Sequence, residues 1–237
     1  MIKHFLSKLR IVGCVATLLL MTSGAEARDL TDAEVREVSQ KVRTAMADAG
    51  YDAGSALKFR PDVDGGGYDR ENDVIYLGHI QNFPQPIRQA LRQATKGDDA
   101  AIMAGLTAHE FCHADLKRRG YSPALIAAKA RCPAMSESPT DDLFEEVLCD
   151  ITAIRVLGGR PAAAIVAIRQ QAIAADSSPN RLLGARLTGR GAALLPTSVL
   201  PKQDVSEAMA RICDVASAIE IRESSGRGAK ADSMQPM

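Results

Sequence analysis

Two histidines and a glutamate stand close together in the segment HEFCH, which runs from His109 to His113. Successive residues of an α-helix are about 100° apart, so His109 and His113 lie about 40° apart and one turn from each other. Two imidazoles in this relation can bind one tetrahedral metal ion. Glu110 falls about 60° from His113, on the same side of the helix, where its carboxylate can reach a water bound to the metal. The spacing therefore predicts two zinc ligands and a general base.

Such a site would hydrolyse a carbonyl compound. Zinc lowers the pKa of its bound water towards about 7, and Glu110 would accept the proton as the water attacks a carbonyl carbon. The alternative is that both histidines are core residues and Glu110 is a surface carboxylate. Two inward-facing imidazoles without a partner would be costly to bury, and a metal removes this cost.

A catalytic zinc also needs a third protein ligand and an open coordination position. No histidine follows His113, so we expect a carboxylate from the segment TDDLFEEVLCDITAIRVLGGRP, residues 140–161. Glu146 and Asp150 are four residues apart on this predicted helix and share a face. We expect Glu146 to bind the metal and Asp150 to accept a hydrogen bond from the free ring nitrogen of a ligand histidine. Glu145 points about 100° away from Glu146, and we expect it to be solvated.

HEFCH followed by Glu146-x-x-x-Asp150 and a Gly–Pro exit resembles the gluzincin metallopeptidases. Residues 145–161 are most similar to the HtpX and CAAX-prenyl-protease type, whose usual form is Glu-x-x-Ala-Asp. The resemblance covers about positions 70–190, and its specific part is these two helices. It implies one zinc held by His109, His113 and Glu146, with Glu110 as general base and Asp150 behind the ligands.

Three features depart from that family pattern. Cys149 replaces the usual Ala, the membrane helices of the best-known members are absent, and the downstream His-Pro motif is reduced to Pro179 and Arg181. The group that stabilises the transition state is therefore left open among Arg181, Tyr121 and His79. The segment NDVIYLG, residues 72–78, fits the edge strand that receives the substrate backbone in zincin-type enzymes, and it fits an ordinary core strand equally well.

The elements that must position these residues are mostly helical. Hydrophobic residues make up 46% of the chain and aromatic residues 4%, which favours helices with a core of Ala, Leu, Ile and Val. Two strands are predicted, near Leu57–Arg60 and Val74–Leu77, with a turn at Gly65–Gly67 between them. Helices are predicted over residues 31–50, after Pro86, from Asp98 or Asp99 to Gly120, from Thr140, and over 162–176 and 203–222. We therefore expect a mostly helical α+β fold of zincin type, with a small sheet packed on the HExxH helix and a helical half after it.

The N-terminus is typical of an export signal. Residues 1–27 combine a basic start, the apolar run IVGCVATLLLM and the small residues AEA. We expect cleavage after Ala27; an uncleaved anchor and a lipoprotein box ending at Cys14 are the alternatives. The expected mature domain covers residues 28–223, followed by a disordered tail over 224–237. The predicted location is the periplasm or the medium, without stable membrane insertion.

The charge of the chain limits the classes of binding partner, and its cysteine content limits the possible disulfides. Basic and acidic residues number 29 each, so the chain has no basic footprint for nucleic acid. Cys112, Cys132, Cys149 and Cys213 remain after signal cleavage and allow two disulfides in three pairings, with Cys112 either a packing residue or half of a disulfide.

Together the two motifs predict zinc-dependent hydrolysis of peptide bonds in a protein or peptide substrate. The first alternative is a non-catalytic, zinc-stabilised binding or assembly protein of the periplasm, derived from a protease. The second is a helical structural protein without a metal, for which both motifs would be coincidental.

Overall fold

The structure is a computed structural model that describes residues 30–120, 132, 143–175, 188, 210, 212–214 and 217. The predicted signal peptide (1–27), the predicted tail (224–237), Tyr121 and Arg181 lie outside these residues. The described part is mostly helical with one small sheet, which confirms the α+β class. Within it, no helix has both the length and the apolar character needed to cross a bilayer.

The sheet has three strands: β1 (Ala56–Asp64), β2 (Gly66–Asp69) and β3 (Val74–His79). β3 lies in the centre, parallel to β1 and antiparallel to β2. The predicted turn at Gly65–Gly67 is confirmed only at Gly65, because Gly66 and Gly67 pair with Leu77 and Tyr76 of β3. Pairing with a neighbouring strand overrides the low strand propensity of glycine. Gly65, at φ +78°, supplies the corner between β1 and β2.

The central place of β3 favours the second of the two alternatives for residues 72–78, an ordinary core strand. A strand that is hydrogen-bonded on both sides has no free edge for a substrate. β2 pairs with β3 alone among the described strands, and it is the strand with most contact to the HExxH helix. The edge beside the site therefore belongs to β2.

The described helices match the predicted segments, while the predicted start at Thr140 and most of the predicted helix over 203–222 lie outside the described residues. The helices are α1 (Asp32–Asp48), α2 (Gln85–Thr95), α3 (Asp99–Arg118), α6 (Leu143–Leu157) and α7 (Gly159–Ala175), with a 3-10 turn η1 at Ile80–Asn82. Thr31 caps α1 in a capping box: its hydroxyl accepts from the N–H of Glu34, and its own N–H donates to the Glu34 carboxylate at 2.8 Å. Asp98 caps α3 by accepting from the N–H of Ala101.

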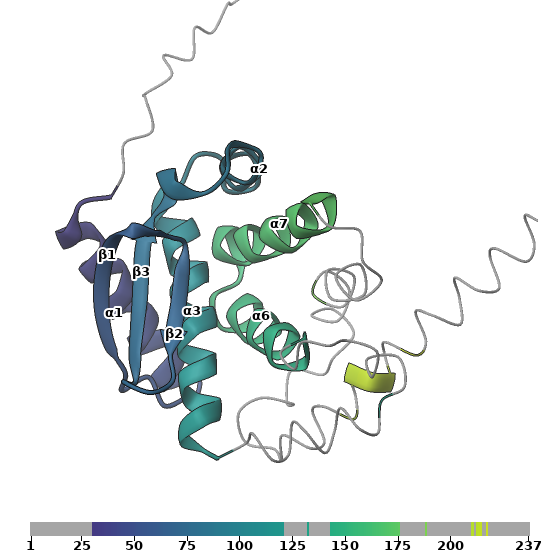
Figure 1. The fold of residues 1–237 in the computed structure, drawn as a ribbon. Helices are drawn as coiled ribbons and strands as arrows, with labels where there is room; N and C mark the ends of the chain where they lie inside the picture. Colours follow the sequence, from purple (N-terminus) through teal and green to yellow (C-terminus); the bar gives the residue numbers. More distant parts are fainter. Residues whose placement is uncertain are drawn as a thin grey trace, which may run out of the picture.

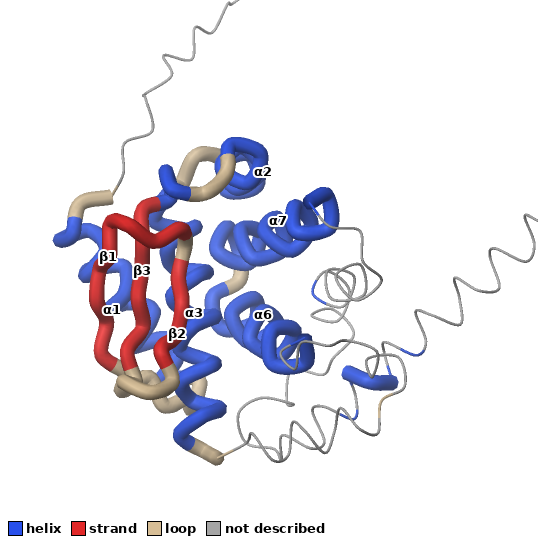
Figure 2. Tube along the Cα trace, in the orientation of Figure 1, coloured by secondary structure: helices blue, strands red, loops and turns tan. Residues whose placement is uncertain are grey.

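Helix α3 is the centre of the fold. Figure 1 shows the sheet on one side of α3 and the helices α6 and α7 on the other, with α1 behind the sheet. In Figure 2 the strands gather at one side of a mainly helical body. Because neighbours cover α3 on several sides, residues 105–116 are all buried, including the polar ones. Polar groups buried this deeply need partners, and α6 supplies them for the two histidines.

Candidate metal centre

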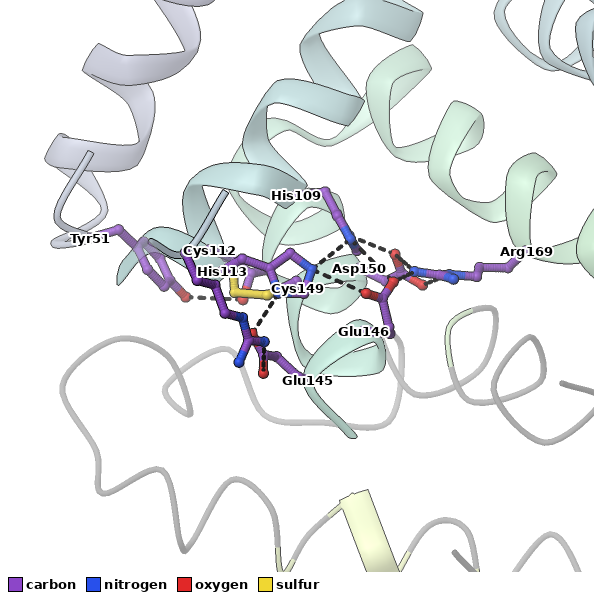
Figure 3. Close-up of a disulfide and its surroundings, with 11 residues drawn as sticks. Tyr51, His109, Cys112, His113, Glu145, Glu146, Cys149, Asp150 and Arg169 are labelled. Carbon is purple, nitrogen blue, oxygen red and sulfur yellow. Dashed lines mark hydrogen bonds and ion pairs between the residues drawn. A yellow bond between two sulfur atoms is a disulfide. The ribbon is translucent and has the colours of Figure 1, made fainter. Parts of the chain in front are cut away.

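The three predicted metal ligands meet at the contact between α3 and α6. His109 and His113 are each 7% exposed, and their Nε2 atoms lie 3.0 Å apart. Glu146 of α6 places Oε2 3.3 Å from Nε2 of His109 and Oε1 3.3 Å from Nε2 of His113. One ligand atom from each of the three residues lies within 4.8 Å of the other two. Figure 3 shows the two imidazoles and the carboxylate converging from the two helices.

A second carboxylate lies behind each imidazole. Asp150 Oδ1 is 2.9 Å from Nδ1 of His109, so Asp150 lies beside the predicted imidazole, but the pair does not have the geometry of a hydrogen bond. Glu145 Oε1 is 2.7 Å from Nδ1 of His113. With both Nδ1 atoms turned to carboxylates, the Nε2 atoms are left facing each other and Glu146. Two Nε2 lone pairs at this separation need a proton or a cation between them.

The contact of Glu145 corrects the prediction that this residue is solvated. Glu145 is 6% exposed. Its second oxygen accepts a hydrogen bond from Nη2 of Arg70 at 2.6 Å. The helical offset from Glu146 was right, but α3 and the turn after β2 cover this side of α6 as well. Glu145 therefore orients His113 as Asp150 orients His109.

Arg169 of α7 is a residue of the site that sequence reasoning missed. Its guanidinium donates to the carboxylates of Glu146 and Asp150, at 3.2 Å for Asp150 Oδ1. It is the only charged residue in the run AAAIVAIRQQAIAA, and this isolated charge was the available signal. No fixed spacing connects it to either motif.

Among the described residues, the charges of the cluster do not balance without a cation. Four carboxylates (Glu110, Glu145, Glu146 and Asp150) meet two guanidiniums (Arg70 and Arg169), which leaves two negative charges if both histidines are neutral. Two imidazolium ions or one divalent metal ion would compensate this excess. The donor set and the charge thus fit a divalent metal.

The pKa values of the histidines reflect the same imbalance. Burial by itself lowers the pKa of His109, but contacts with Asp150 and Glu146 outweigh it and raise that pKa to about 10. For His113, burial is likewise outweighed by Glu145 and Glu146, and the pKa rises to about 9. In the other direction, burial raises the pKa of Glu146, yet the two histidines and Arg169 together hold it far below its usual range. Without a metal, the surrounding carboxylates therefore favour the protonated form of both imidazoles.

Glu110 differs from the other acids of the cluster. It is 7% exposed, and nothing in the described part of the chain hydrogen-bonds to its carboxylate. Burial raises its pKa, while the charges of His109 and His113 lower it to a smaller extent. Glu110 faces a cavity of about 180 Å³ that it shares with His109, Glu146 and Arg169. This position suits a group that exchanges a proton with a molecule in the cavity.

The rest of the cavity is formed by the sheet edge and by apolar side chains. It is lined by Gly65, Gly66, Phe83, Leu106, Ile165 and Ile168. A Cβ atom on Gly66 would lie 3.3 Å from Cγ of Glu110, so the strand passes directly over this carboxylate. His79, one of the three candidates for transition-state stabilisation, does not line the cavity and packs edge-on against Phe59.

The cysteines form two disulfides, Cys112–Cys149 and Cys132–Cys213. This pairing resolves the open choice for Cys112, which is half of a disulfide. The first disulfide joins α3 to α6 inside the two motifs. Cys112 is therefore unable to act as a fourth metal ligand while the bond is intact.

No protein family, curated protein or solved structure matches this chain. A function must therefore be inferred from the residues of the site and their geometry.

Proposed function

We propose that the protein is a zinc metallopeptidase that hydrolyses peptide bonds in a protein or peptide substrate. One observation carries the proposal: the two imidazoles and the Glu146 carboxylate converge on one point, and His109 and Glu146 line a cavity together with Glu110, to whose carboxylate no described residue hydrogen-bonds. The proposal includes the gluzincin resemblance and the zincin-type packing of the sheet on α3.

Zinc is the metal that best fits these ligands. Two neutral imidazoles and one carboxylate form a known catalytic zinc set, which leaves the fourth position to water. Magnesium and calcium favour sites made only of oxygen ligands. A divalent ion also neutralises the two excess negative charges of the cluster.

The chain's own residues would divide the work of hydrolysis. When bound, the metal would activate water and polarise the scissile carbonyl. Glu110 would accept the proton of the attacking water and return it to the leaving amine. Burial raises the pKa of Glu110, which brings this pKa closer to neutral pH and so favours proton exchange under physiological conditions. Asp150 and Glu145 would hold the imidazoles in the orientation and tautomer that present Nε2.

The substrate would bind as an extra strand along β2. This strand borders the cavity through Gly66 and has β3 as its one partner among the described strands. Main-chain hydrogen bonds along such an edge accept many sequences, which suits a protein or peptide substrate. Leu106, Ile165 and Ile168 would receive an apolar side chain next to the scissile bond.

Export to the periplasm or the medium is part of the proposal. Two disulfides in a chain of this size are typical of oxidising compartments. The predicted signal peptide would direct the chain there.

The proposal is tested with Glu110→Gln in the mature protein, using fluorescently labelled casein as an unfolded substrate. The variant should retain one zinc per chain, because Glu110 is not a ligand, and should lose cleavage. Wild type should lose cleavage with a chelator and regain it when zinc is added. Wild-type rates of proteolysis in Glu110→Gln would remove this residue from the mechanism.

The second candidate is a non-catalytic zinc-stabilised binding protein. One observation favours it: Arg169 is the only cationic side chain that the described residues contribute to the cavity wall besides His109, and Glu146 and Asp150 already hold it. A bound zinc without chelator-sensitive cleavage would support this candidate.

A further inference from the structure

The two metal motifs share a feature that the proposed reaction does not use. In HEFCH, Cys112 is three residues after His109 and directly before His113. In EVLCD, Cys149 is three residues after Glu146 and directly before Asp150. The structure joins these two equivalent positions in one disulfide.

This disulfide lies where the positions of α3 and α6 decide the geometry of the centre. It holds the two Cα atoms 5.2 Å apart, and the cysteines are 1% and 0% exposed. His109 and Glu146 each lie about 4.5 Å along the helix axis from the crosslink, at a rise of 1.5 Å per residue. Figure 3 shows the sulfur atoms beside His113 and the ligand cluster.

The tolerance of the centre is small compared with the movements available to two packed helices. The ligand atoms from both helices lie within 4.8 Å of one another. Functional constellations must be held within about 0.5 Å, whereas a one-residue slip of α6 along α3 shifts Glu146 by about 1.5 Å. A covalent bond within one residue of His113 prevents this slip.

We infer that the Cys112–Cys149 disulfide is a positioning element of the metal centre, and that zinc affinity depends on its being intact. The inference rests on the proposed zinc site and adds a requirement for oxidation to it. The cysteines act through His113, Glu146 and Asp150 and do not touch the metal themselves.

The second disulfide provides a matched control. Cys132–Cys213 closes a loop with a sequence separation of 81, compared with 37 for Cys112–Cys149. Neither Cys132 nor Cys213 adjoins a residue of the site in sequence. Removing this bond should therefore destabilise the fold at least as much, without releasing the ligands.

The test compares the zinc Kd of three full-length mature proteins, measured by competition with a chromophoric chelator. Cys112→Ala/Cys149→Ala should weaken zinc binding about 10- to 100-fold, the usual loss when support of metal ligands is removed. Cys132→Ala/Cys213→Ala should stay within about 2-fold of wild type. With cobalt in place of zinc, only the first variant should show weaker and broader tetrahedral absorption bands. An unchanged Kd and an unchanged cobalt spectrum in the first variant would overturn the inference.

A measurement on the wild type covers the case in which the first variant does not fold. In a glutathione buffer, each protein disulfide becomes two thiols while two glutathione thiols become glutathione disulfide. If the disulfide strengthens zinc binding, zinc must disfavour reduction of the Cys112–Cys149 bond by the same factor. Saturating zinc should therefore shift this equilibrium about 10- to 100-fold and leave Cys132–Cys213 unshifted. Equal behaviour of the two bonds, or easier reduction of the first with zinc, would contradict the inference.

The two proposals fail in different ways. A wild-type protein that binds no zinc would refute the proposed function. Wild-type zinc binding that does not respond to the state of Cys112–Cys149 would refute only this inference.

Discussion

Zinc binding to the metal-free protein should release about two protons per chain at pH 7. In the absence of metal, His109 and His113 have pKa values raised to about 10 and about 9, so both are imidazolium ions at pH 7. A zinc ligand must be a neutral imidazole. The two protons are therefore displaced by one ion that carries the same charge.

The size of the pH effect follows from this exchange. While both histidines are protonated in the free protein, the zinc Kd should fall about 100-fold for each pH unit, because two protons compete with one metal ion. The slope should decrease as the pH approaches 9 and His113 begins to lose its proton in the free protein.

Isothermal titration calorimetry in two buffers with different ionisation enthalpies measures the protons released. Glu145→Gln is the informative variant, because Glu145 is one of the two carboxylates that raise the pKa of His113. It should release fewer protons than wild type at pH 8. Release of less than one proton by wild type at pH 7, or a pH-independent Kd, would refute the charge balance assigned to the cluster.

Three further predictions concern stability, the third ligand and the sheet edge. The pKa values of both histidines are raised above 6.5 on folding, so their contribution to the stability of the metal-free protein is complete below pH 6.5 and is lost as the pH rises through about 9 to 10. The urea midpoint of the zinc-free protein should therefore fall over that pH window. A constant midpoint would argue against the raised pKa values. Glu146→Ala should lower zinc affinity by more than the 10- to 100-fold loss typical of outer-shell partners, measured by chelator competition, and full metal occupancy in dilute protein would exclude Glu146 as a ligand. Gly66→Ala should reduce kcat about 10-fold at unchanged zinc content, because the new Cβ would lie 3.3 Å from Cγ of Glu110. Gly67→Ala should leave kcat unchanged, because its Cβ would meet nothing within 4 Å. Equal rates in the two variants would show that Gly66 does not position Glu110.

The parts of the site that the sequence predicted are those set by position along one helix. The 40° offset between His109 and His113, and the four-residue step from Glu146 to Asp150, hold for any regular α-helix. The contact between Asp150 and His109 followed from this periodicity together with the need of a ligand imidazole for a second partner.

The parts that were missed depend on how separate elements pack. The expectation that Glu145 is solvated used only its angle on α6 relative to Glu146. In the structure, the turn that carries Arg70 covers this side of α6. Arg169 comes from a third helix at no fixed spacing. β2 contains two glycines, and pairing with β3 rather than intrinsic propensity makes them a strand. The Cys112–Cys149 pairing depends on the register of α3 against α6, although the equal spacing of cysteine in both motifs was a signal for it.

The central claim is that one zinc ion lies between α3 and α6 with three protein ligands. An anomalous difference map at the zinc edge, from crystals of the purified protein, tests this claim most directly. The account predicts one peak per chain, about 2.0–2.2 Å from Nε2 of His109, Nε2 of His113 and a carboxylate oxygen of Glu146, with a water at the fourth position. A fully zinc-loaded crystal with no peak among these three residues, or with Glu146 directed away from the peak, would contradict it.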